Sequence, residues 1–374
     1  MKDKVKDQFP GLQEITYFNN AAQCPVPRKT LAAIEQITEA LGRPHVVPDV
    51  AGTIKSAKKR LADLINAETG EVTFIPNTSV GISTAAASLP LRRGDEVLTV
   101  ENEHPTLLYP WLNLRKQGVE IRQVPWGNGR KPTSRLLENV TERTRVIALS
   151  HVEWVRGFRH DLQEIGKLCA ERGVYLVVDA IQSMGVMPVD VRASHISVLA
   201  AGGYKWLMSG RGNGCLFVAK HVAHQMQPTL VGRHGVRKVT GSDQLEFYSD
   251  IRRFNTGAWN LPAIVALDSS IELLQQIGLN TITDRVIRRT DTLVDGLEQL
   301  GLQVLSCREP EHRSSIVAFS TGDEQGNAEL FFHLQDNDVY LARKRGNLRA
   351  GIHYFNTYSD VNRLLQVAET VFTK

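Results

Sequence analysis

Short apolar runs alternate with helical patterns through the middle of the chain, and this alternation constrains the fold more than any other feature. Strands are expected in four apolar runs, at residues 96–100, 119–124, 145–150 and 175–180. Helices are expected at 105–117 and at 161–172, the second with an acid at its start. Continuous apolar strands separated by helices indicate a mainly parallel sheet covered on both faces. In such sheets, ligands bind beyond the carboxyl ends of the strands.

The length of the chain, 374 residues, predicts two domains. A single core stops growing at roughly 250 to 300 residues. After about residue 250 the pattern changes to that of a smaller α+β domain, with helices at 262–277 and 281–300, a strand near 314–320 and a final helix from about 359. Residues 233–252 show little apolar periodicity, and we expect a surface loop or a domain junction there. We therefore expect a large domain at 16–258 and a small domain formed by 1–15 and 259–374.

Composition excludes several classes of function. The net charge is +4 and the basic residues are scattered among acids, which argues against a nucleic-acid partner. Four cysteines lie far apart, so we expect no metal site and free thiols in a reducing cytoplasm; they are Cys24, Cys169, Cys215 and Cys307. We expect neither a signal peptide nor a membrane span, because no apolar run approaches the ~20 residues that a span requires.

An acid and a lysine follow two successive predicted strands. Asp179 ends the run YLVVD, and Lys205 lies 26 residues later, beyond the next apolar run. A lysine beside a glycine-rich turn is most often a surface residue whose stem packs on apolar neighbours. The combination is more specific, because a pyridoxal phosphate site needs a lysine to form a Schiff base and a carboxylate to keep the pyridine nitrogen protonated.

Two further segments fit such a site. Asn77, Thr78 and Ser79 open a helix of small residues, whose free amides and dipole suit a phosphate, although simple capping explains the same residues. His104 follows a predicted strand and would stack on a cofactor ring, although a lone histidine is usually a polar residue satisfied by its neighbours.

Eight segments, spread in order over nearly the whole chain, resemble the class V aminotransferase family of fold-type I pyridoxal phosphate enzymes. They are YFNNAAQCPVP, NTSVGI, ENEHPTLLYPW, SHVEWVRGFRHDL, VVDAIQSMG, YKWL, RFNTGAWN and LRAGIHYFNT. The family includes cysteine desulfurases, cysteine carbon–sulfur lyases and isopenicillin N epimerase. The resemblance implies an α/β fold of the fold-type I transferase class, a small amino-acid substrate, and a homodimer with its active sites at the interface.

The resemblance also implies roles for individual residues. The catalytic residues are the Schiff-base Lys205, Asp179 at the pyridine nitrogen and His104 on the ring. The cofactor-binding residues are Asn77, Thr78, Ser79, Gln182 and Tyr204, with Gln182 donating to the ring hydroxyl. The substrate-binding residues are Asn20 and Arg349, the latter as a clamp for the α-carboxylate. An arginine suits that task because its planar fork meets a carboxylate with two parallel hydrogen bonds.

Several positions depart from the family pattern. Tyr204 stands where relatives often carry a histidine that helps to hold the phosphate, and Gly202 stands where an aspartate is frequent. The pair Gly257 and Ala258 replaces Gly-Thr, which removes a hydroxyl that would reach the partner subunit's phosphate. Trp154 occupies a place where desulfurases show an asparagine. Tyr204 either substitutes for the phosphate ligand or acts as a catalytic acid, and both roles stay open.

The reaction type is less constrained than the cofactor. A desulfurase that relays a persulfide needs a nucleophilic cysteine on a loop facing the site, and neither 320–331 nor 339–351 contains one. We expect Cys307 to be a structural residue and not the nucleophile of a persulfide relay. β-Elimination from a cysteine-like amino acid is therefore the leading hypothesis, with epimerisation, transamination, a decarboxylating or deaminating reaction and cysteine desulfuration as alternatives. A non-catalytic cofactor-binding protein and a nicotinamide dehydrogenase are disfavoured, because Lys205 and Asp179 are both present and no GxGxxG follows an early strand.

Overall fold

Seven strands form one large, mainly parallel sheet in the computed structural model, which describes residues 5–43, 45–126, 132–241 and 243–372. Across the sheet the order is β2 (Val72–Phe74), β8 (Gly214–Val218), β7 (Val198–Gly202), β6 (Tyr175–Asp179), β5 (Thr144–Ser150), β3 (Glu96–Val100) and β4 (Glu120–Val124). Neighbours from β4 to β7 pair in parallel, and β8 runs antiparallel to β7 and β2. The parallel strands predicted from the apolar runs are confirmed.

Helices cover this sheet, as continuous apolar strands require. The helices of this region are α1 (Arg28–Leu41), α2 (Val50–Leu64), α3 (Thr78–Ser88), α4 (Pro105–Leu112), α5 (Pro132–Glu138), α6 (Leu162–Arg172) and α7 (Lys220–Ala223). Asp161 caps α6 by accepting from the amides of Gln163 and Glu164 at 3.0 and 3.1 Å, and Gly173 ends it with a φ of 64°. Both ends of this helix are therefore where the sequence predicts them.

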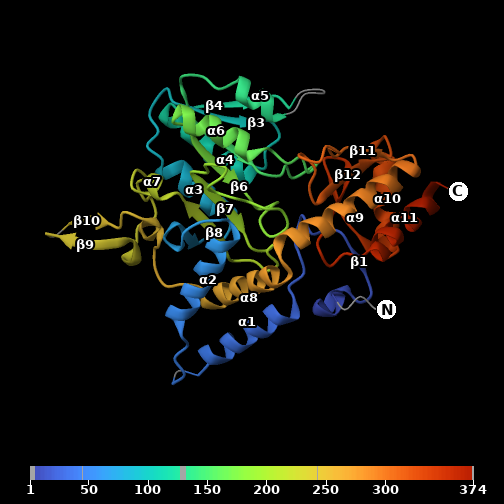
Figure 1. The fold of residues 1–374 in the computed structure, drawn as a ribbon, viewed down its shortest axis with the longest axis horizontal. Coiled ribbons are helices and arrows are strands. Elements are labelled where there is room, and N and C mark those ends of the chain that lie inside the picture. The colour runs from blue at the N-terminus through green and yellow to red at the C-terminus, as the bar shows by residue number, and fades with distance from the viewer. Residues whose placement is uncertain (1–4, 44, 127–131, 242, 373–374) are drawn as a thin grey trace.

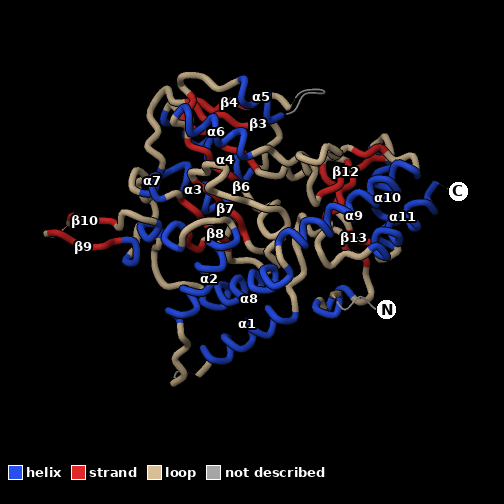
Figure 2. The backbone as a smooth tube through the Cα atoms, in the orientation of Figure 1, coloured by secondary structure: helices blue, strands red, loops and turns tan. Residues whose placement is uncertain are grey.

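A second, smaller sheet forms a separate lobe at the right of Figures 1 and 2. Its strand order is β11 (Gln303–Val304), β12 (Ile316–Ser320), β15 (Asn347–Gly351) and β14 (Ala342–Lys344). The helices of this lobe are α9 (Leu279–Gln299), α10 (Glu324–Asp336) and α11 (Tyr358–Phe372). Near the N-terminus, β1 (Thr16–Tyr17) pairs with β13 (Val339–Tyr340), so the start of the chain lies beside its C-terminal third. Helix α8 (Leu261–Ile277) packs against α1 and α2, and a division at residue 258 stays a prediction.

Residues 233–252 differ from the expected loop. They contain an antiparallel hairpin, β9 (Val236–Thr240) and β10 (Gln244–Phe247), which projects from the body at the left of Figure 1. Backbone pairing and a cross-strand ion pair between Arg237 and Glu246 at 3.4 Å hold the two strands together. The expectation of a loop was wrong because nearly every side chain of the hairpin is exposed, so no buried face leaves a strong apolar alternation in the sequence.

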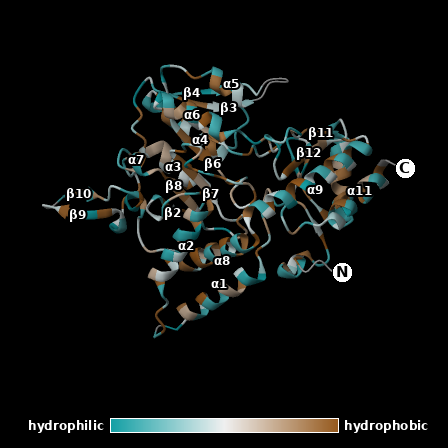
Figure 3. Cartoon of the chain, viewed as in Figure 1, coloured by the Kyte–Doolittle hydropathy of each residue, from teal (hydrophilic) through white to brown (hydrophobic). Residues whose placement is uncertain are grey.

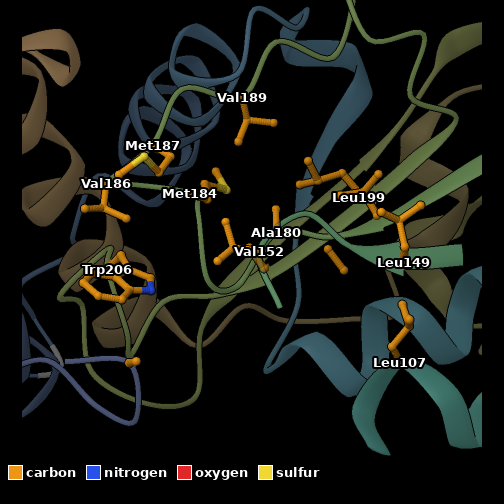
Figure 4. Close-up of a cluster of buried hydrophobic side chains, with 14 of the residues drawn as sticks. Leu107, Leu149, Val152, Ala180, Met184, Val186, Met187, Val189, Leu199 and Trp206 are labelled. Atoms are coloured by element: carbon orange, nitrogen blue, oxygen red, sulfur yellow. The ribbon is translucent and has the colours of Figure 1, made fainter. Parts of the chain in front are cut away.

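The core lies beneath the carboxyl ends of the central strands. Figure 4 shows part of it, with Ala180, Val152 and Met184 near the middle of the view, Leu199 to one side and Trp206 to the other. In Figure 3 the helices around the sheet carry both apolar and polar residues, as expected for helices with one buried face. None of the helices described is both long and apolar enough to cross a membrane.

Candidate active site

Asp179 marks the centre of the site at the carboxyl edge of the large sheet. Strand register places it between Ser150 of β5 and Ala200 of β7. Its side chain is 2% exposed, and its Oδ1 accepts a hydrogen bond from the amide of Ile181 at 2.9 Å. Burial raises the pKa of this carboxyl, while the Ile181 amide and the positive charge of Lys205 act in the opposite direction. A buried acid is therefore held at a strand end, as the sequence predicts.

Lys205 follows β7 in a tight turn and is 8% exposed. Burial lowers the pKa of its ammonium group, and the charges of Arg349 and Lys344 lower it further. The charge of Asp179 acts in the opposite direction. The lowered pKa increases the neutral fraction of the amine, which is the form that attacks a carbonyl.

The start of α3 brings the three predicted phosphate ligands together. Asn77 caps the helix by accepting from the amide of Val80 at 3.0 Å, and it is exposed. Thr78 is buried, and its Oγ1 accepts from the amide of Gly202 at 2.9 Å. The Ser79 hydroxyl is exposed and lies 3.1 Å from that of Thr106. The helix N-terminus therefore faces the end of β7 with unpaired amides in its first turn, an arrangement that suits an anion.

Gly202 explains one of the departures from the family pattern. A Cβ atom at this position would lie 3.2 Å from the ring of Tyr204 and 3.3 Å from Thr78 Oγ1, so a larger side chain would be crowded. Tyr204 fills this space, with its ring centre 5.8 Å from Lys205 Nζ and 5.6 Å from the guanidinium carbon of Arg211. Burial raises the pKa of the Tyr204 hydroxyl, so the hydroxyl remains a hydrogen-bond donor.

His104 caps α4, with its Nδ1 accepting from the amide of Thr106 at 3.2 Å. Burial lowers its pKa to about 4, and the charge of Lys205 adds to this effect, so the imidazole is neutral and carries its proton on Nε2. Trp154 meets the ring edge-on at 5.1 Å, and its Nε1 donates to the carbonyl of Asn102 at 3.0 Å. Trp154 therefore forms a wall beside His104 at the place where an asparagine was expected.

Arg349 lies on β15 and is 2% exposed. Its Nη1 donates to the carbonyl of Trp154, while its Nε has no hydrogen-bond partner among the described residues. Burial lowers the pKa of the guanidinium to about 10, and the charge of Glu153 partly offsets this effect. A buried guanidinium with a free donor fits a substrate carboxylate, which would satisfy that donor.

Asn20 and Gln182 link the N-terminal segment to the site. Asn20 donates from Nδ2 to the carbonyl of Gly351 at 2.8 Å and to Asn356 Oδ1 at 3.0 Å. Its Oδ1 is buried and has no partner within the described chain. Gln182 donates to the Ala21 carbonyl at 3.0 Å and accepts from Trp206 Nε1 at 2.9 Å, which leaves it one free N–H. The roles assigned to both residues remain predictions.

Three residues of the site were not identified from the sequence. Glu103 is buried below His104, and burial raises its pKa to about 7. Cys24 is fully buried, and its amide donates to the carbonyl of Tyr204 at 3.0 Å. Lys344 acts electrostatically on both His104 and Lys205. Glu103 and Cys24 lie in two of the segments that resemble the family, ENEHPTLLYPW and YFNNAAQCPVP. This location is the feature of the sequence that could have identified them as site residues.

Arg253 is a second buried arginine, but its guanidinium is not available to hold a substrate carboxylate. Its Nε donates to the Tyr248 carbonyl at 2.8 Å and its Nη1 to the Met226 carbonyl at 2.7 Å, so its guanidinium holds backbone together.

The set of side chains fits pyridoxal phosphate. Asp179 is placed to hold a proton on a pyridine nitrogen, and Lys205 offers a buried amine of lowered pKa. The first turn of α3 offers amides to a phosphate, and Arg349 keeps one buried donor free. The pyridine nitrogen, the aldehyde and the phosphate of the cofactor, and the carboxylate of an amino acid, therefore each find a complementary group on this chain.

Comparison with known proteins identifies the family. The family model for "Aminotransferase class-V" matches residues 16–364. A probable cysteine desulfurase of Methanothermobacter thermautotrophicus is 27% identical, over 99% of this chain and 98% of the relative. The uncharacterized aminotransferase YcbU of Bacillus subtilis is 25% identical, over 98% and 96%. The structure of the cystine C–S lyase C-DES with its reaction product, cysteine persulfide, superposes with a TM-score of 0.88 at 25% identity, over 96% of this chain and 99% of that one. The chain therefore belongs to the class V aminotransferase family and is a pyridoxal phosphate-dependent enzyme of fold-type I.

Proposed function

We propose that this enzyme cleaves the carbon–sulfur bond of a cysteine-type amino acid by β-elimination. The observation that carries the proposal is the turn between β14 and β15. Lys344 pairs with Asn347, so Arg345 and Gly346 alone connect the strands, both with positive φ (49° and 82°). This is the geometry of a two-residue hairpin turn. Such a turn provides no loop on which a persulfide-carrying cysteine could face Lys205.

The cysteines found elsewhere do not replace such a loop. Cys24 is fully buried, and burial raises the pKa of its thiol well above the usual range, so it is a poor nucleophile. Cys307 is half-buried in the smaller lobe and lines a cavity there with Thr290, Asp291 and Arg313. A carbon–sulfur lyase needs no catalytic thiol, because the sulfur leaves with its own substituent.

The mechanism assigns one task to each of four groups, three at the carboxyl edge of the large sheet and Arg349 on β15 of the smaller one. Pyridoxal phosphate, when bound, supplies an electron sink for the carbanion at the substrate Cα. Asp179 holds a proton at the pyridine nitrogen, and Arg349 fixes the α-carboxylate. His104, neutral because of its lowered pKa, would stack on the cofactor ring without adding charge. Lys205 Nζ is the base that takes the Cα proton.

Product analysis tests the reaction type. The purified holoenzyme is incubated with L-cystine and with L-cysteine, and pyruvate, ammonia, alanine and carbon dioxide are quantified by mass spectrometry and coupled assays. β-Elimination predicts equal amounts of pyruvate and ammonia with a released thiol or persulfide. Alanine as the main product would indicate a desulfurase instead. Carbon dioxide without pyruvate would indicate decarboxylation, and racemised substrate an epimerase.

The same proposal includes a cytoplasmic homodimer with active sites at the interface. All four cysteines are free, which suits a reducing compartment. The projecting hairpin and the segment before it expose Leu230, Val231, Val239 and Leu245 to solvent, and a second copy would cover such apolar side chains. Light scattering coupled to size exclusion tests this point, with the expected mass being twice 41.6 kDa.

A further inference from the structure

Lys344 and Arg349 lie on one face of the β14–β15 hairpin. The register pairs Ala342 with Arg349 and Lys344 with Asn347. Directly paired residues of an antiparallel ladder point to the same side, and the next residue along points to the opposite side. Lys344 and Arg349 are therefore diagonal neighbours on one face, with Cα atoms about 7 to 8 Å apart. Arg343, which pairs with Leu348, lies on the other face.

The positive charge of Lys344 acts on two residues of the active site. Lys344 is half-buried, and its positive charge lowers the pKa values of His104 and Lys205. Burial lowers the pKa of Lys344 itself, and the neighbouring charge of Arg349 adds to this effect. The strand register supports the same placement, because it puts Lys344 on the face of the hairpin that carries Arg349.

No acid of the described chain balances Lys344. Glu153 acts on Arg349, but neither an ion pair nor a hydrogen bond joins the Lys344 ammonium group to any residue within the described ranges. Placing a second cation beside a buried arginine costs free energy unless an anion binds between or beside them. The α-carboxylate of a substrate would balance the positive charge of Arg349 but would leave that of Lys344 unbalanced.

A cavity adjoins the turn of this hairpin. It has a volume of about 410 Å³, and its walls include Asn347, the cross-strand partner of Lys344, together with Asn102, Glu153 and Arg345. The guanidinium of Arg345 lies over the ring of Trp154 at 5.6 Å, so the hairpin adds a cation to a lining that also includes Glu101 and Arg156.

We propose that Lys344 binds a second anionic group of the substrate, so that the enzyme selects amino acids whose side chain ends in an oxyanion. The inference rests on the proposed function, because it takes Arg349 to hold the α-carboxylate of an amino acid. For a carbon–sulfur lyase, this class is a cysteine derivative whose sulfur substituent carries a carboxylate or sulfur oxyanion. The leaving group then departs as an anion stabilised by the Lys344 ammonium group.

Pairs of nearly isosteric amino acids test the inference without depending on the reaction. The holoenzyme is titrated with L-glutamate and L-glutamine, and with L-aspartate and L-asparagine, and dissociation constants are read from the change in cofactor absorbance. We expect the charged member of at least one pair to bind at least tenfold more tightly. Lys344→Met should abolish this preference, measured as the ratio of the two dissociation constants within each pair. Lys344→Arg should retain it.

Arg343→Met is the matched control, because it removes one positive charge from the same strand but from the opposite face, and the Arg343 side chain is exposed. Its preference should equal that of the wild type. Equal affinities for the charged and neutral members in the wild type, or a preference that survives in Lys344→Met, would overturn the role of Lys344. Neither result would contradict the proposed function. A wild-type spectrum that responds to no amino acid would overturn the proposed function and this inference with it.

Discussion

The carboxyl group of Glu103 accepts two hydrogen bonds from Ser150, one from the amide at 2.7 Å and one from the hydroxyl at 2.6 Å. This contact joins the residue before His104 to the end of β5, next to Asp179. Glu103 is almost fully buried, and burial raises its pKa from 4.5 to about 7, with the negative charge of Asp179 adding to the effect. The carboxyl group that connects the segment before His104 to the end of β5 therefore has a pKa near neutral pH.

This relationship predicts a pH dependence of stability. Between pH 4.5 and 7 the native state holds a proton on Glu103 that the unfolded state has lost, so the free energy of unfolding falls as pH rises. The loss is on the order of 3 kcal/mol and is complete above pH 7. Glu103→Gln can still accept from the Ser150 amide and should remove this slope. Denaturant unfolding at pH 5 and pH 8 measures the difference, and parallel losses in both proteins would contradict the assignment.

The cofactor should be linked to Lys205. Borohydride reduction of the holoenzyme followed by peptide mapping is expected to place the modification on this residue, because its amine is buried beside Asp179 with a lowered pKa. Lys344 is the informative alternative, since it is the other lysine whose charge acts on His104. A modification found there would exchange the roles of the two lysines.

Replacement of Asp179 separates its charge from its hydrogen bond. Asp179→Asn keeps an oxygen that can accept from the Ile181 amide but removes the negative charge. If the carboxylate holds a proton on the pyridine nitrogen, turnover should fall by about a hundredfold or more, while cofactor still binds. Turnover within threefold of the wild type would mean that the carboxylate serves only to cap the turn.

The large sheet and the position of its catalytic edge were predictable from the sequence. The strands that carry Ser150, Asp179 and Ala200 are apolar along their central residues, and a buried parallel strand needs that composition. Because each of these strands runs in the same direction, residues at their carboxyl ends meet at one edge. Asp179 and Lys205 could therefore be placed at that edge without knowledge of side-chain contacts.

Other parts of the site depend on register and burial, which the sequence does not reveal. Lys344 shares a face with Arg349 only because the turn between their strands has two residues, and a turn longer by one would change the pairing. Glu103 is buried because it meets Ser150, 47 residues away in the chain. The exposed hairpin β9–β10 was missed for the opposite reason, since its strands bury no continuous face.

Removal of Arg349 should impair substrate binding and not cofactor binding. Its loss leaves a substrate carboxylate unpaired in a buried position, which costs about 3 to 5 kcal/mol, or roughly a hundredfold to several thousandfold in kcat/KM. Arg349→Ala should show this loss with an unchanged cofactor spectrum, and Arg349→Lys should recover part of it. Arg343→Met provides a control on the opposite face of the same hairpin. Unchanged kinetics in Arg349→Ala would assign the carboxylate to another residue.

Tyr204→Phe distinguishes the two roles left open for this hydroxyl. The ring of Tyr204 lies against Gly202 and close to Thr78, at the N-terminus of α3 where the phosphate is expected, and its raised pKa keeps the hydroxyl protonated. We therefore expect it to donate to the phosphate. A hydrogen bond to a charged group contributes about 1.5 to 3 kcal/mol, so cofactor affinity should fall roughly tenfold to a hundredfold. At saturating cofactor, kcat should remain within twofold of the wild type. Equilibrium dialysis of cofactor and initial rates measure the two quantities, and the reverse pattern would make Tyr204 the catalytic acid.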